Sequence, residues 1–386
     1  MVKDKSSLVN KVGLENIESF SGRYIPTESI YDGNGVEAHE GDILYGKLRP
    51  YLAKVWIATR QCNAVGDFFV YRCNKKLLLN NYAKWLMLSD GFTKICSAST
   101  YGAKMPRVSA DFISSLSIPV PPLAEQERIV SYLEDKTSKI DKYVAEKEKE
   151  ILLLQELKQK TIADAVTKGL NPDVKMTDYS SLITSSHPNH WKILRNKTFL
   201  SLTGEKVGNR ANEFELLSLT TRGVIVRDLV SGKGKFPKDF DTYQFVRKDE
   251  LVFCLFDIDE TPRTVGLVDT EGMLTGAYTA FKVNTEIALP EYVYNFFLCV
   301  DNIKALKPYY SGLRKTVRAD KFLQIYIPLP PLSEQRAIVA YIEGKCQKID
   351  TLVSELQAEI DNMKEYKQRL IADCVTGQVN VQNETV

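Results

Sequence analysis

Two stretches of the chain carry apolar residues at the spacing of a long, paired helix. In residues 328–386 the apolar residues recur at alternating intervals of three and four, which is the heptad pattern of a coiled-coil seam. Residues 118–175 carry apolar residues at the equivalent heptad positions. Neither helix can bury such a stripe alone, so the two seams are predicted to pack against each other. The positions predicted for this helix-pairing seam are Ile140, Val144, Ile151, Leu154, Val353, Leu356, Ile360, Met363 and Leu370.

Each of these helices has a sequence signal at both ends. Prolines precede it, and an acidic residue, Glu125 or Glu334, falls in its first turn, where the exposed amides favour an anion. Gly169 and Gly377 indicate the stops. The first helix, from about Ala124 to Lys168, would be roughly 65 Å long.

The two helical stretches belong to an internal repeat. Residues 118–171 and 327–380 align without gaps, and roughly half of the positions are identical. Lys158 and Lys367 occupy equivalent polar positions in the seam. They are expected either to set the register of the pair or to extend their stems along the seam toward solvent.

A globular segment precedes each helix. Short apolar or alternating runs, such as 42–46, 68–71, 250–254 and 280–283, are typical of strands, and longer apolar runs at 82–88 and 292–298 are typical of helices. The predicted fold is therefore mixed α/β: two lobes, 1–117 and 188–327, with two long helices, 118–175 and 328–386, as an antiparallel coiled coil. Trp191 is expected to anchor the core of the second lobe.

Charge is distributed unevenly along the chain, whose net charge is +2. Residues 1–117 carry +4 and residues 188–327 carry +3, whereas residues 118–187 and 328–386 carry −2 and −3. The lobes, rather than the helices, are thus the expected contact for a polyanion, although biases this small also occur in proteins that bind no nucleic acid.

Both lobes contain a basic, turn-like segment after their apolar helix, at residues 101–107 and 310–318. Lys and Arg on such loops can neutralise phosphates, and Arg can also bind guanine edges; the alternative is that these are ordinary solvated surface loops. Lys47, Arg49 and Arg263, which follow predicted strands, are second candidates. The candidate DNA-binding residues are Lys47, Arg49, Lys104, Arg107, Arg263, Arg314, Lys315 and Arg318.

Sequence signals for catalysis are weak. Residues 41–48 approach a phosphate-binding loop, but Leu48 replaces the Ser or Thr that ligates magnesium, and the run is typical of a strand. Asn171-Pro172-Asp173 only approximates an adenine methyltransferase motif, and three histidines support no catalytic triad or metal cluster. We expect no catalysis by this chain, no metal and no cofactor of its own.

The compartment follows from what the sequence lacks. The chain shows no signal peptide, no membrane-length apolar run and no CxxC pair among its seven cysteines, which are expected to be small core residues. A cytoplasmic location without membrane contact is therefore expected.

The combination of lobes, helices and motifs resembles the specificity subunit of type I restriction-modification systems. The motif Ile-Pro-x-Pro-Pro-Leu-x-Glu-Gln, which opens a helix in that family, stands at residues 118–126 and 327–335. Residues 12–17, 41–51 and 99–107 also look like phrases common in such subunits. The resemblance identifies residues 1–117 and 188–327 as two target-recognition domains, and the two helices as spacers between them.

The resemblance implies a function in DNA restriction and modification. Each lobe would read one half of a bipartite sequence in double-stranded DNA, and the helices would set the unread spacer and bind two modification subunits. S-adenosylmethionine, ATP and magnesium would belong to those methyltransferase subunits and to restriction or translocase subunits. The alternatives are a coiled-coil assembly scaffold that binds no DNA, or a fragment of an enzyme that fuses modification and recognition.

The two lobes differ at their beginnings. The second lobe starts near Trp191, about 25 residues before its strand at 215–219, whereas the comparable Lys11 and Val12 lie close to Met1. The first lobe is therefore expected to lack its opening strand, which would call DNA reading by that lobe into question.

Overall fold

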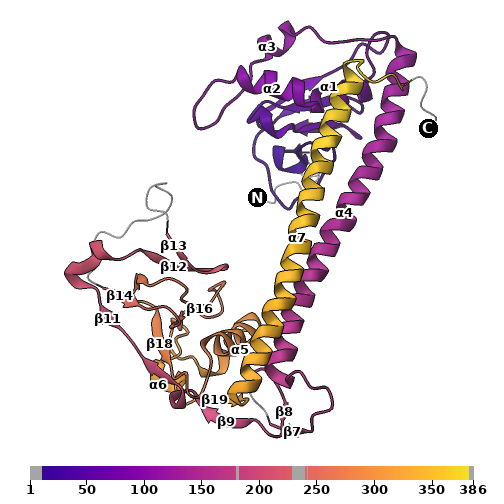
Figure 1. Cartoon of the computed structure of the whole chain (residues 1–386). Helices are drawn as coiled ribbons and strands as arrows, with labels where there is room; N and C mark the ends of the chain where they lie inside the picture. The colour runs from indigo at the N-terminus through magenta and orange to yellow at the C-terminus, as the bar shows by residue number, and fades with distance from the viewer. Residues whose placement is uncertain (1–10, 180–181, 228–239, 241, 382–386) are drawn as a thin grey trace, which may run out of the picture. The chain divides into compact units, whose positions relative to one another are not determined.

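The computed structural model of the chain describes residues 11–179, 182–227, 240 and 242–381 (Figure 1). The chain divides into two compact units, one formed by Met1–Glu150 with Glu355–Val386 and the other by Ile151–Ser354. Each unit therefore contains one lobe and about half of each long helix.

The two long helices are α4 (Leu123–Lys168) and α7 (Leu332–Val375). They pair antiparallel within each unit: Lys367 Nζ lies 2.6 Å from Asp141 Oδ1 in one unit, and Lys158 Nζ lies 2.7 Å from Asp350 Oδ1 in the other. These two pairs are the same contact in the two halves of the repeat. The predicted antiparallel coiled coil is confirmed.

The seam residues lie on the covered side of the helices. Those that are buried are Ile140, Val144, Ile360 and Leu370, and those that are half-buried are Ile151, Leu154, Val353, Leu356 and Met363. Lys367, between Met363 and Leu370, is also buried. The helices are also buried in the second unit, where Ile162, Ile338 and Ile349 are at most 7% exposed.

The first lobe contains two small sheets, with strand orders β1-β5-β2 and β4-β3-β6. Its strands are β1 (Lys11–Val12), β2 (Val36–Ala38), β3 (Ile43–Gly46), β4 (Val55–Ile57), β5 (Cys62–Ala64) and β6 (Phe68–Tyr71), and its helices are α1 (Asn80–Leu88), α2 (Asp90–Ala98) and α3 (Ala110–Ser115). Strand β3 is buried throughout, which confirms that the near phosphate-loop sequence is a strand.

The second lobe has a larger set of elements. Its strands are β7 (Met176–Asp178), β8 (Ser186–Pro188), β9 (Lys192–Arg195), β10 (Leu200–Leu202), β11 (Glu205–Lys206), β12 (Leu217–Thr220), β13 (Gly223–Val226), β14 (Tyr243–Val246), β15 (Leu251–Phe253), β16 (Val265–Leu267), β17 (Gly272–Thr275), β18 (Thr279–Val283) and β19 (Tyr326–Leu329), and its helices are α5 (Pro290–Asn302) and α6 (Ala319–Phe322). The main sheet has the order β10-β18-β15-β16.

Aromatic side chains fill the centre of the second lobe. The rings of Phe253, Phe281, Phe297 and Phe322 lie 4.8–5.7 Å apart between centroids, and all four are at most 1% exposed. Trp191 belongs to the same core and is 4% exposed, which confirms its predicted role as an anchor.

The lobes repeat each other in topology. Strands β4, β3 and β6 correspond in order and direction to β16, β15 and β18, and α1 follows β6 as α5 follows β18. The parallel pairing of Lys11 with Asn63 has its counterpart in the parallel bridge between Leu216 and Met273. The internal repeat therefore extends from the helices into the lobes.

A tyrosine hydroxyl joins each lobe to the C-terminal end of one long helix in an equivalent way. In the first lobe, the Tyr82 hydroxyl donates to the Val375 carbonyl at the end of α7, at 3.0 Å. In the second lobe, the Tyr292 hydroxyl donates to the Val166 carbonyl near the end of α4, also at 3.0 Å. Burial raises the pKa of Tyr82 to about 12 and also raises the pKa of Tyr292 well above its ordinary value, so both remain neutral donors.

The start of each long helix is fixed by a buried glutamine. Gln126 accepts from Leu79 N at 2.8 Å and donates to the carbonyls of Leu77 and Pro121. Gln335 makes the same three bonds with Leu289, Ile287 and Pro330. In each lobe, the glutamine side chain thus joins the loop before α1 or α5 to the proline segment before the long helix.

The remaining expectations concern cysteines and membranes. All seven cysteines are free; Cys73 and Cys346 are half-buried and the other five are buried, as expected of core residues. Within the described part of the chain, no helix combines the length and apolar character that crossing a membrane requires.

The two Lys–Asp pairs of the coiled coil differ in burial, so they should contribute differently to stability. We expect Lys367→Ala to lower the free energy of unfolding of its unit by about 1–2 kcal/mol, because the lysine side chain is 11% exposed and Asp141 would lose its partner. The matched change, Lys158→Ala, should cost less than about 1 kcal/mol, since Lys158 and Asp350 are more exposed. Urea unfolding of both variants measures the difference; equal costs would mean that burial does not govern these pairs.

Candidate nucleic-acid interface

A short hairpin loop lies at the equivalent place in both lobes. In the first lobe, Tyr101 and Arg107 exchange two backbone hydrogen bonds of 3.0 Å. In the second lobe, Ser311 and Thr316 do the same at 3.0 and 3.2 Å. The basic segments found in the sequence are therefore two closed loops with defined conformations.

Both hairpin loops are held against the end of the central strand of a sheet. Val108 N donates to the Lys47 carbonyl at 3.1 Å, and Arg49 N donates to the Pro106 carbonyl at 2.7 Å. The corresponding bonds in the second lobe run from Val317 to Leu255 at 2.8 Å and from Asp257 to Arg314 at 2.9 Å. Each loop thus forms one surface with the segment after β3 or β15.

This correspondence refines the position of Arg263. The residue lies in the segment after β15, as predicted, but at its far end, directly before β16. The positions equivalent to Lys47 and Arg49 are Leu255 and Asp257, so the second lobe has no cation there. Arg49 and Asp257 share a left-handed backbone, with φ of 51° and 46°.

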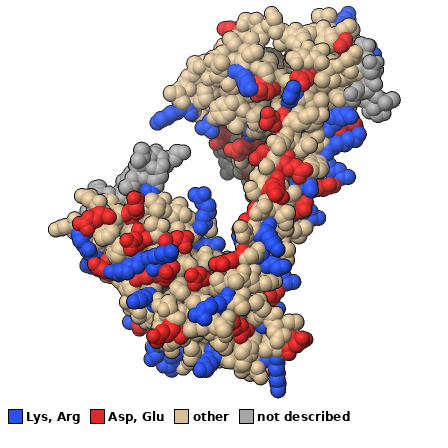
Figure 2. Space-filling view, in the orientation of Figure 1, with Lys and Arg blue, Asp and Glu red and all other residues tan. Residues whose placement is uncertain are grey.

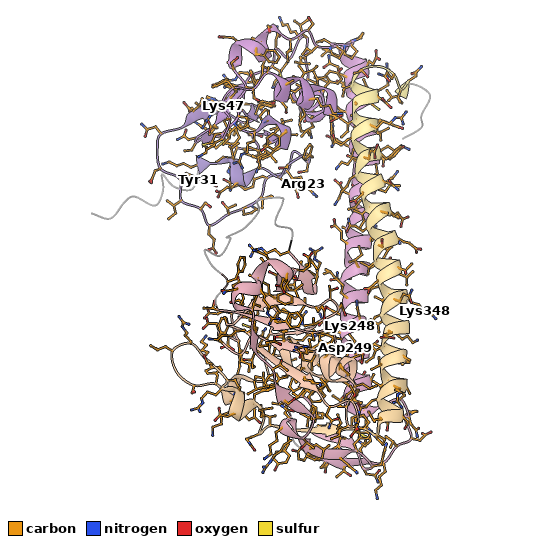
Figure 3. All side chains as sticks on the ribbon, turned by 60° about the vertical axis from the view of Figure 1, so that its left-hand side comes forward. Arg23, Tyr31, Lys47, Lys248, Asp249 and Lys348 are labelled. Atoms are coloured by element: carbon orange, nitrogen blue, oxygen red, sulfur yellow. The ribbon has the colours of Figure 1, made fainter. Side chains whose placement is uncertain are left out.

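Two of the four candidate cations of the first lobe contact the same carboxylate, that of Asp67. Arg107 donates to both oxygens of Asp67 at 2.9 and 2.8 Å, and Lys47 (labelled in Figure 3) lies 3.9 Å from the same group. The hydrogen bonds from Arg107 hold the pKa of Asp67 below its usual value. Arg49 and Lys104 are exposed, and their side chains make no hydrogen bond or ion pair with any described residue.

In the second lobe three of the four candidate cations are also paired. Lys315 lies 3.3 Å from Glu260 and 3.4 Å from Asp259, and hydrogen bonds to these carboxylates raise its pKa. The remaining pairs are Arg318 with Asp320 at 3.0 Å and Arg263 with the buried Asp301 at 3.2 Å. Arg314 is exposed at the loop tip, and among the described residues its side chain has no hydrogen-bond or ion-pair partner.

Unpaired cations matter most because they lose no intramolecular partner when they meet a phosphate. By that criterion Arg49, Lys104 and Arg314 are the strongest of the predicted set. Arg107 and Arg263 instead brace their own lobes, each through a carboxylate distant in sequence.

The structure adds exposed apolar residues that the sequence reasoning missed. Leu313 at the tip of one loop is fully exposed, and Tyr101 and Met105 of the other are 59% and 48% exposed. An apolar side chain beside a cation suits contact with base edges, the thymine methyl group in particular. The signal was present in the sequence, since each stands within three residues of Lys or Arg in a glycine-containing segment.

The charge elsewhere is mixed rather than uniformly basic. Figure 2 shows Asp and Glu side chains interspersed with Lys and Arg over the face in view. On this face positive and negative side chains alternate, so a nucleic-acid contact here would depend on local groups.

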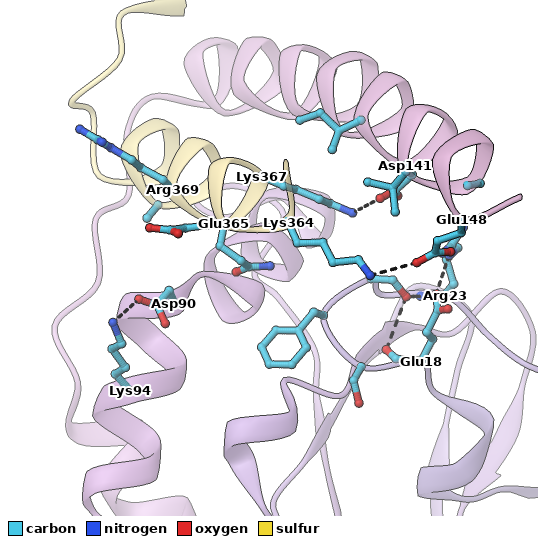
Figure 4. Close-up of a pocket in the computed structure, with 18 residues that line it drawn as sticks. Glu18, Arg23, Asp90, Lys94, Asp141, Glu148, Lys364, Glu365, Lys367 and Arg369 are labelled. Atoms are coloured by element: carbon cyan, nitrogen blue, oxygen red, sulfur yellow. Dashed lines mark hydrogen bonds and ion pairs between the residues drawn. The ribbon is translucent and has the colours of Figure 1, made fainter. Parts of the chain in front are cut away.

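A hollow of about 950 Å³ lies between the first lobe and the half of the helix pair in the same unit (Figure 4). Its charged residues pair with one another, as Lys364 Nζ does with Glu148 Oε1 at 3.0 Å and Arg23 with Glu18 at 2.7 Å. Within the described ranges, no group of three or more His, Cys, Asp or Glu side chains is placed to hold a metal ion. The hollow therefore offers packing between lobe and helices rather than a reactive site.

Comparison with known protein families gives a match over most of the chain. The family described as "Type I restriction modification DNA specificity domain" matches residues 21–153 and 256–362. These two matched segments each contain one of the hairpin loops, as well as most of α4 and α7.

Among curated proteins, three similar chains carry the name specificity subunit. The Type I restriction enzyme EcoDI specificity subunit of Escherichia coli is 35% identical over 123 residues, which are 31% of this chain and 27% of that one. The MjaVIII subunit of Methanocaldococcus jannaschii is 23% identical over 92% of this chain and 79% of its own length. The EcoBI subunit of Escherichia coli is 21% identical over 92% and 78%.

Two solved structures share the fold. One, from work on complex assembly and conformational transition of the type I R-M system, has a TM-score of 0.72 at 19% identity and covers 96% of this chain and 92% of its own. The HsdS subunit from Thermoanaerobacter tengcongensis has a TM-score of 0.54 at 17% identity, with coverage of 96% and 90%.

Proposed function

Because this chain belongs to the family of type I restriction-modification DNA specificity proteins, we propose that it reads a bipartite DNA sequence, one half with each lobe. The observation that carries this proposal is the pair of equivalent hairpin loops. Each loop is held against the end of a central strand, and each exposes an unpaired cation beside an apolar side chain. Such a surface combines phosphate contact with base contact.

The helices have a separate role in this proposal. We propose that α4 and α7 set the length of the unread spacer and bind two modification subunits, through which restriction or translocase subunits join the complex. Methyl transfer from S-adenosylmethionine, and any chemistry that needs ATP and magnesium, then belongs to those partners. This chain contributes target recognition and positions the partners on DNA.

One observation favours a more limited function for the first lobe. Strands β9 and β10 of the second lobe have no counterpart among the described residues of the first. A lobe without these strands has two open edges, so DNA reading by the second lobe alone, with the first lobe as a scaffold, is the second candidate. The two candidates differ in the DNA they need, since a single-lobe reader would bind one half-site as tightly as two.

Substituting Arg314, the exposed cation at the tip of the hairpin loop in the second lobe, tests the main proposal. We expect Arg314→Ala to weaken DNA binding by the assembled complex and to reduce the slope of log affinity against log salt by about one unit, as for one lost phosphate contact. Lys315→Ala should have a smaller effect, because Asp259 and Glu260 already neutralise that lysine.

Lys197→Ala is the matched control, because Lys197 is an exposed cation of the same lobe outside the loop. Mobility-shift titrations at several salt concentrations provide the slopes for all three variants. An unchanged slope for Arg314→Ala in a complex that assembles normally would assign the loop to ordinary solvated surface.

A further inference from the structure

In the second lobe, one continuous segment covers two strand edges. Within residues 191–202, β9 pairs antiparallel with β19, from Lys192 opposite Leu329 to Arg195 opposite Tyr326. Strand β10 then pairs antiparallel with β18, with Leu200 opposite Val283. The segment is thus a strand, a turn and a second strand, each added to a different edge.

The turn and the apolar residues of this segment are buried. Asn196 is 0% exposed; its amide N donates to the Ile325 carbonyl at 2.8 Å, and its Nδ2 donates to the Phe322 carbonyl at 2.9 Å. Trp191, Phe199 and Leu200 are 4%, 1% and 3% exposed. The residues that fix the segment in place therefore form the sequence pattern Trp-x-Ile-Leu-x-Asn-x-x-Phe-Leu, from Trp191 to Leu200.

The first lobe has the same two edges, but the structure places no described strand on them. Strand β6, the counterpart of β18, pairs only with β3, and residues 117–120, the counterpart of β19, belong to no sheet. Ile118 and Val120 are 38% and 46% exposed, whereas their counterparts Ile327 and Leu329 are 0% and 3% exposed.

An apolar groove of about 700 Å³ lies along these edges, all within the first unit. Six residues that line it are Tyr71, Cys73, Met87, Ile113, Leu116 and Ile118. At the equivalent positions of the second lobe, Phe281, Val283, Phe297, Phe322, Ile325 and Ile327 are buried in the core beneath residues 191–202. The groove therefore has the place and the chemistry of the surface that this segment covers in the second lobe.

The rest of the 386-residue sequence offers no second segment of this kind. Lys11 corresponds to Leu216 through the equivalent parallel pairing, so residues 1–10 correspond to 206–215 and not to 191–202. Residues 1–10 contain no aromatic residue, and neither of the other two tryptophans, Trp56 and Trp85, begins the pattern. A second copy of the chain would have to withdraw its own buried segment from its second lobe.

We infer that the groove of the first lobe is a docking site for a strand–turn–strand segment, distinct from residues 191–202 themselves, that carries the same sequence pattern. The segment adds one strand antiparallel to residues 117–120 and another antiparallel to β6. Main-chain hydrogen bonds satisfy both open edges, and an aromatic and an aliphatic side chain fill the groove. This inference concerns the folding of the lobe and holds whether or not the lobe reads DNA.

Hydrogen exchange of the full chain, with and without a synthetic peptide of residues 191–202, tests the docking site. In the free protein, the amides of residues 113–120 and 71–74 should exchange at least tenfold faster than those of residues 322–329 and 281–284. The peptide should slow the first-lobe amides by tenfold or more, whereas a peptide with Phe199→Asp and Leu200→Asp should not. Protection already present in the free protein, or equal effects of both peptides, would overturn the inference.

A protein variant gives an independent measurement. Ile118→Asp should weaken peptide binding at least tenfold without unfolding the lobe, because the side chain is already 38% exposed. Ile30→Asp, at a 76% exposed position outside the groove, is the control and should bind the peptide normally. Unchanged binding by Ile118→Asp would contradict the inference. So would a dimer of the free chain in which residues 322–329 lose protection, since a second copy would then be the occupant.

Discussion

Replacing Gln335 with leucine should lower the free energy of unfolding of the second unit by at least about 3 kcal/mol, since three buried polar groups each lose a partner at about 1–3 kcal/mol. The side chain is 0% exposed, and its amide joins Leu289 N and the carbonyls of Ile287 and Pro330 at 2.8–3.0 Å. Leucine has a similar volume but can neither donate nor accept. Urea unfolding followed by hydrogen exchange, which reports each lobe separately, measures the loss.

Two further variants make this result interpretable. Gln126→Leu removes the equivalent three bonds from the first unit and should destabilise that unit by a similar amount. Gln347→Leu changes an exposed glutamine of the same helix α7 and should stay within about 0.5 kcal/mol. A loss below 1 kcal/mol for Gln335→Leu would show that water replaces the amide, and that the loop before α5 is held by apolar packing alone.

The long helices were the most predictable part of the fold because their signals are local and repeated. The heptad spacing placed Ile140, Val144, Ile360 and Leu370 on one side, and all four are buried. The prolines and glycines at the ends placed the boundaries of α4 and α7 to within a few residues. Alternating apolar runs likewise identified β3, β6, β15 and β18.

The repeated motif contains both buried glutamines, but their structural role was not predicted from the sequence. Gln126 and Gln335 stand at the same place in a motif otherwise composed of prolines, apolar residues and glutamate. A polar residue that recurs at equivalent positions beside apolar neighbours often satisfies buried backbone groups. The backbone groups that these glutamines bind lie in a loop 46 to 49 residues earlier in the chain. A local sequence pattern cannot identify partners that far away.

The roles of the cations depended on contacts between distant residues. Arg107 looked equivalent to other loop cations, but Asp67, 40 residues earlier, accepts two hydrogen bonds from it. Lys367 was left between setting the register and extending toward solvent; its 2.6 Å contact with Asp141, repeated by Lys158 and Asp350, supports the register role. Composition alone cannot distinguish a paired cation from a free one.

The described residues of the first lobe include no counterpart of β9 or β10, and the acidic residue at the start of each long helix differs accordingly between the lobes. The second lobe buries Trp191 beside Glu334, whose Oε1 accepts from the indole Nε1 at 3.1 Å. The equivalent acidic residue of the first lobe, Glu125, makes no side-chain hydrogen bond or ion pair with any described residue. Among the described residues, the first lobe therefore has a carboxylate without a side-chain partner as well as strand edges without a paired strand.

Shortening both long helices by one heptad should change the preferred DNA spacer by about three base pairs. Removing residues 148–154 from α4 and the facing residues 354–360 from α7 shortens each helix by about 10 Å, at 1.5 Å per residue. Because seven residues are one full repeat of the seam, Lys367 still meets Asp141, and Lys158 still meets Asp350. If the paired helices determine the separation of the lobes, as proposed, that change is transmitted to the DNA at 3.4 Å per base pair.

The experiment requires the target to be known first, which methylation-aware sequencing of the source genome supplies as a bipartite methylated motif. Binding of the assembled complex is then measured on DNA with fixed half-sites and variable spacers. Three base pairs also rotate one half-site by roughly 100° about the duplex, so the shortened complex should bind its best spacer more weakly than the parent binds its own. Deleting residues 148–154 alone is the control: it moves Lys158 off Asp350, and it should disrupt pairing rather than select a new spacer. A doubly shortened complex that keeps the original spacer at full affinity would show that the helices do not set the distance between half-sites, and the scaffold function would then explain α4 and α7 better.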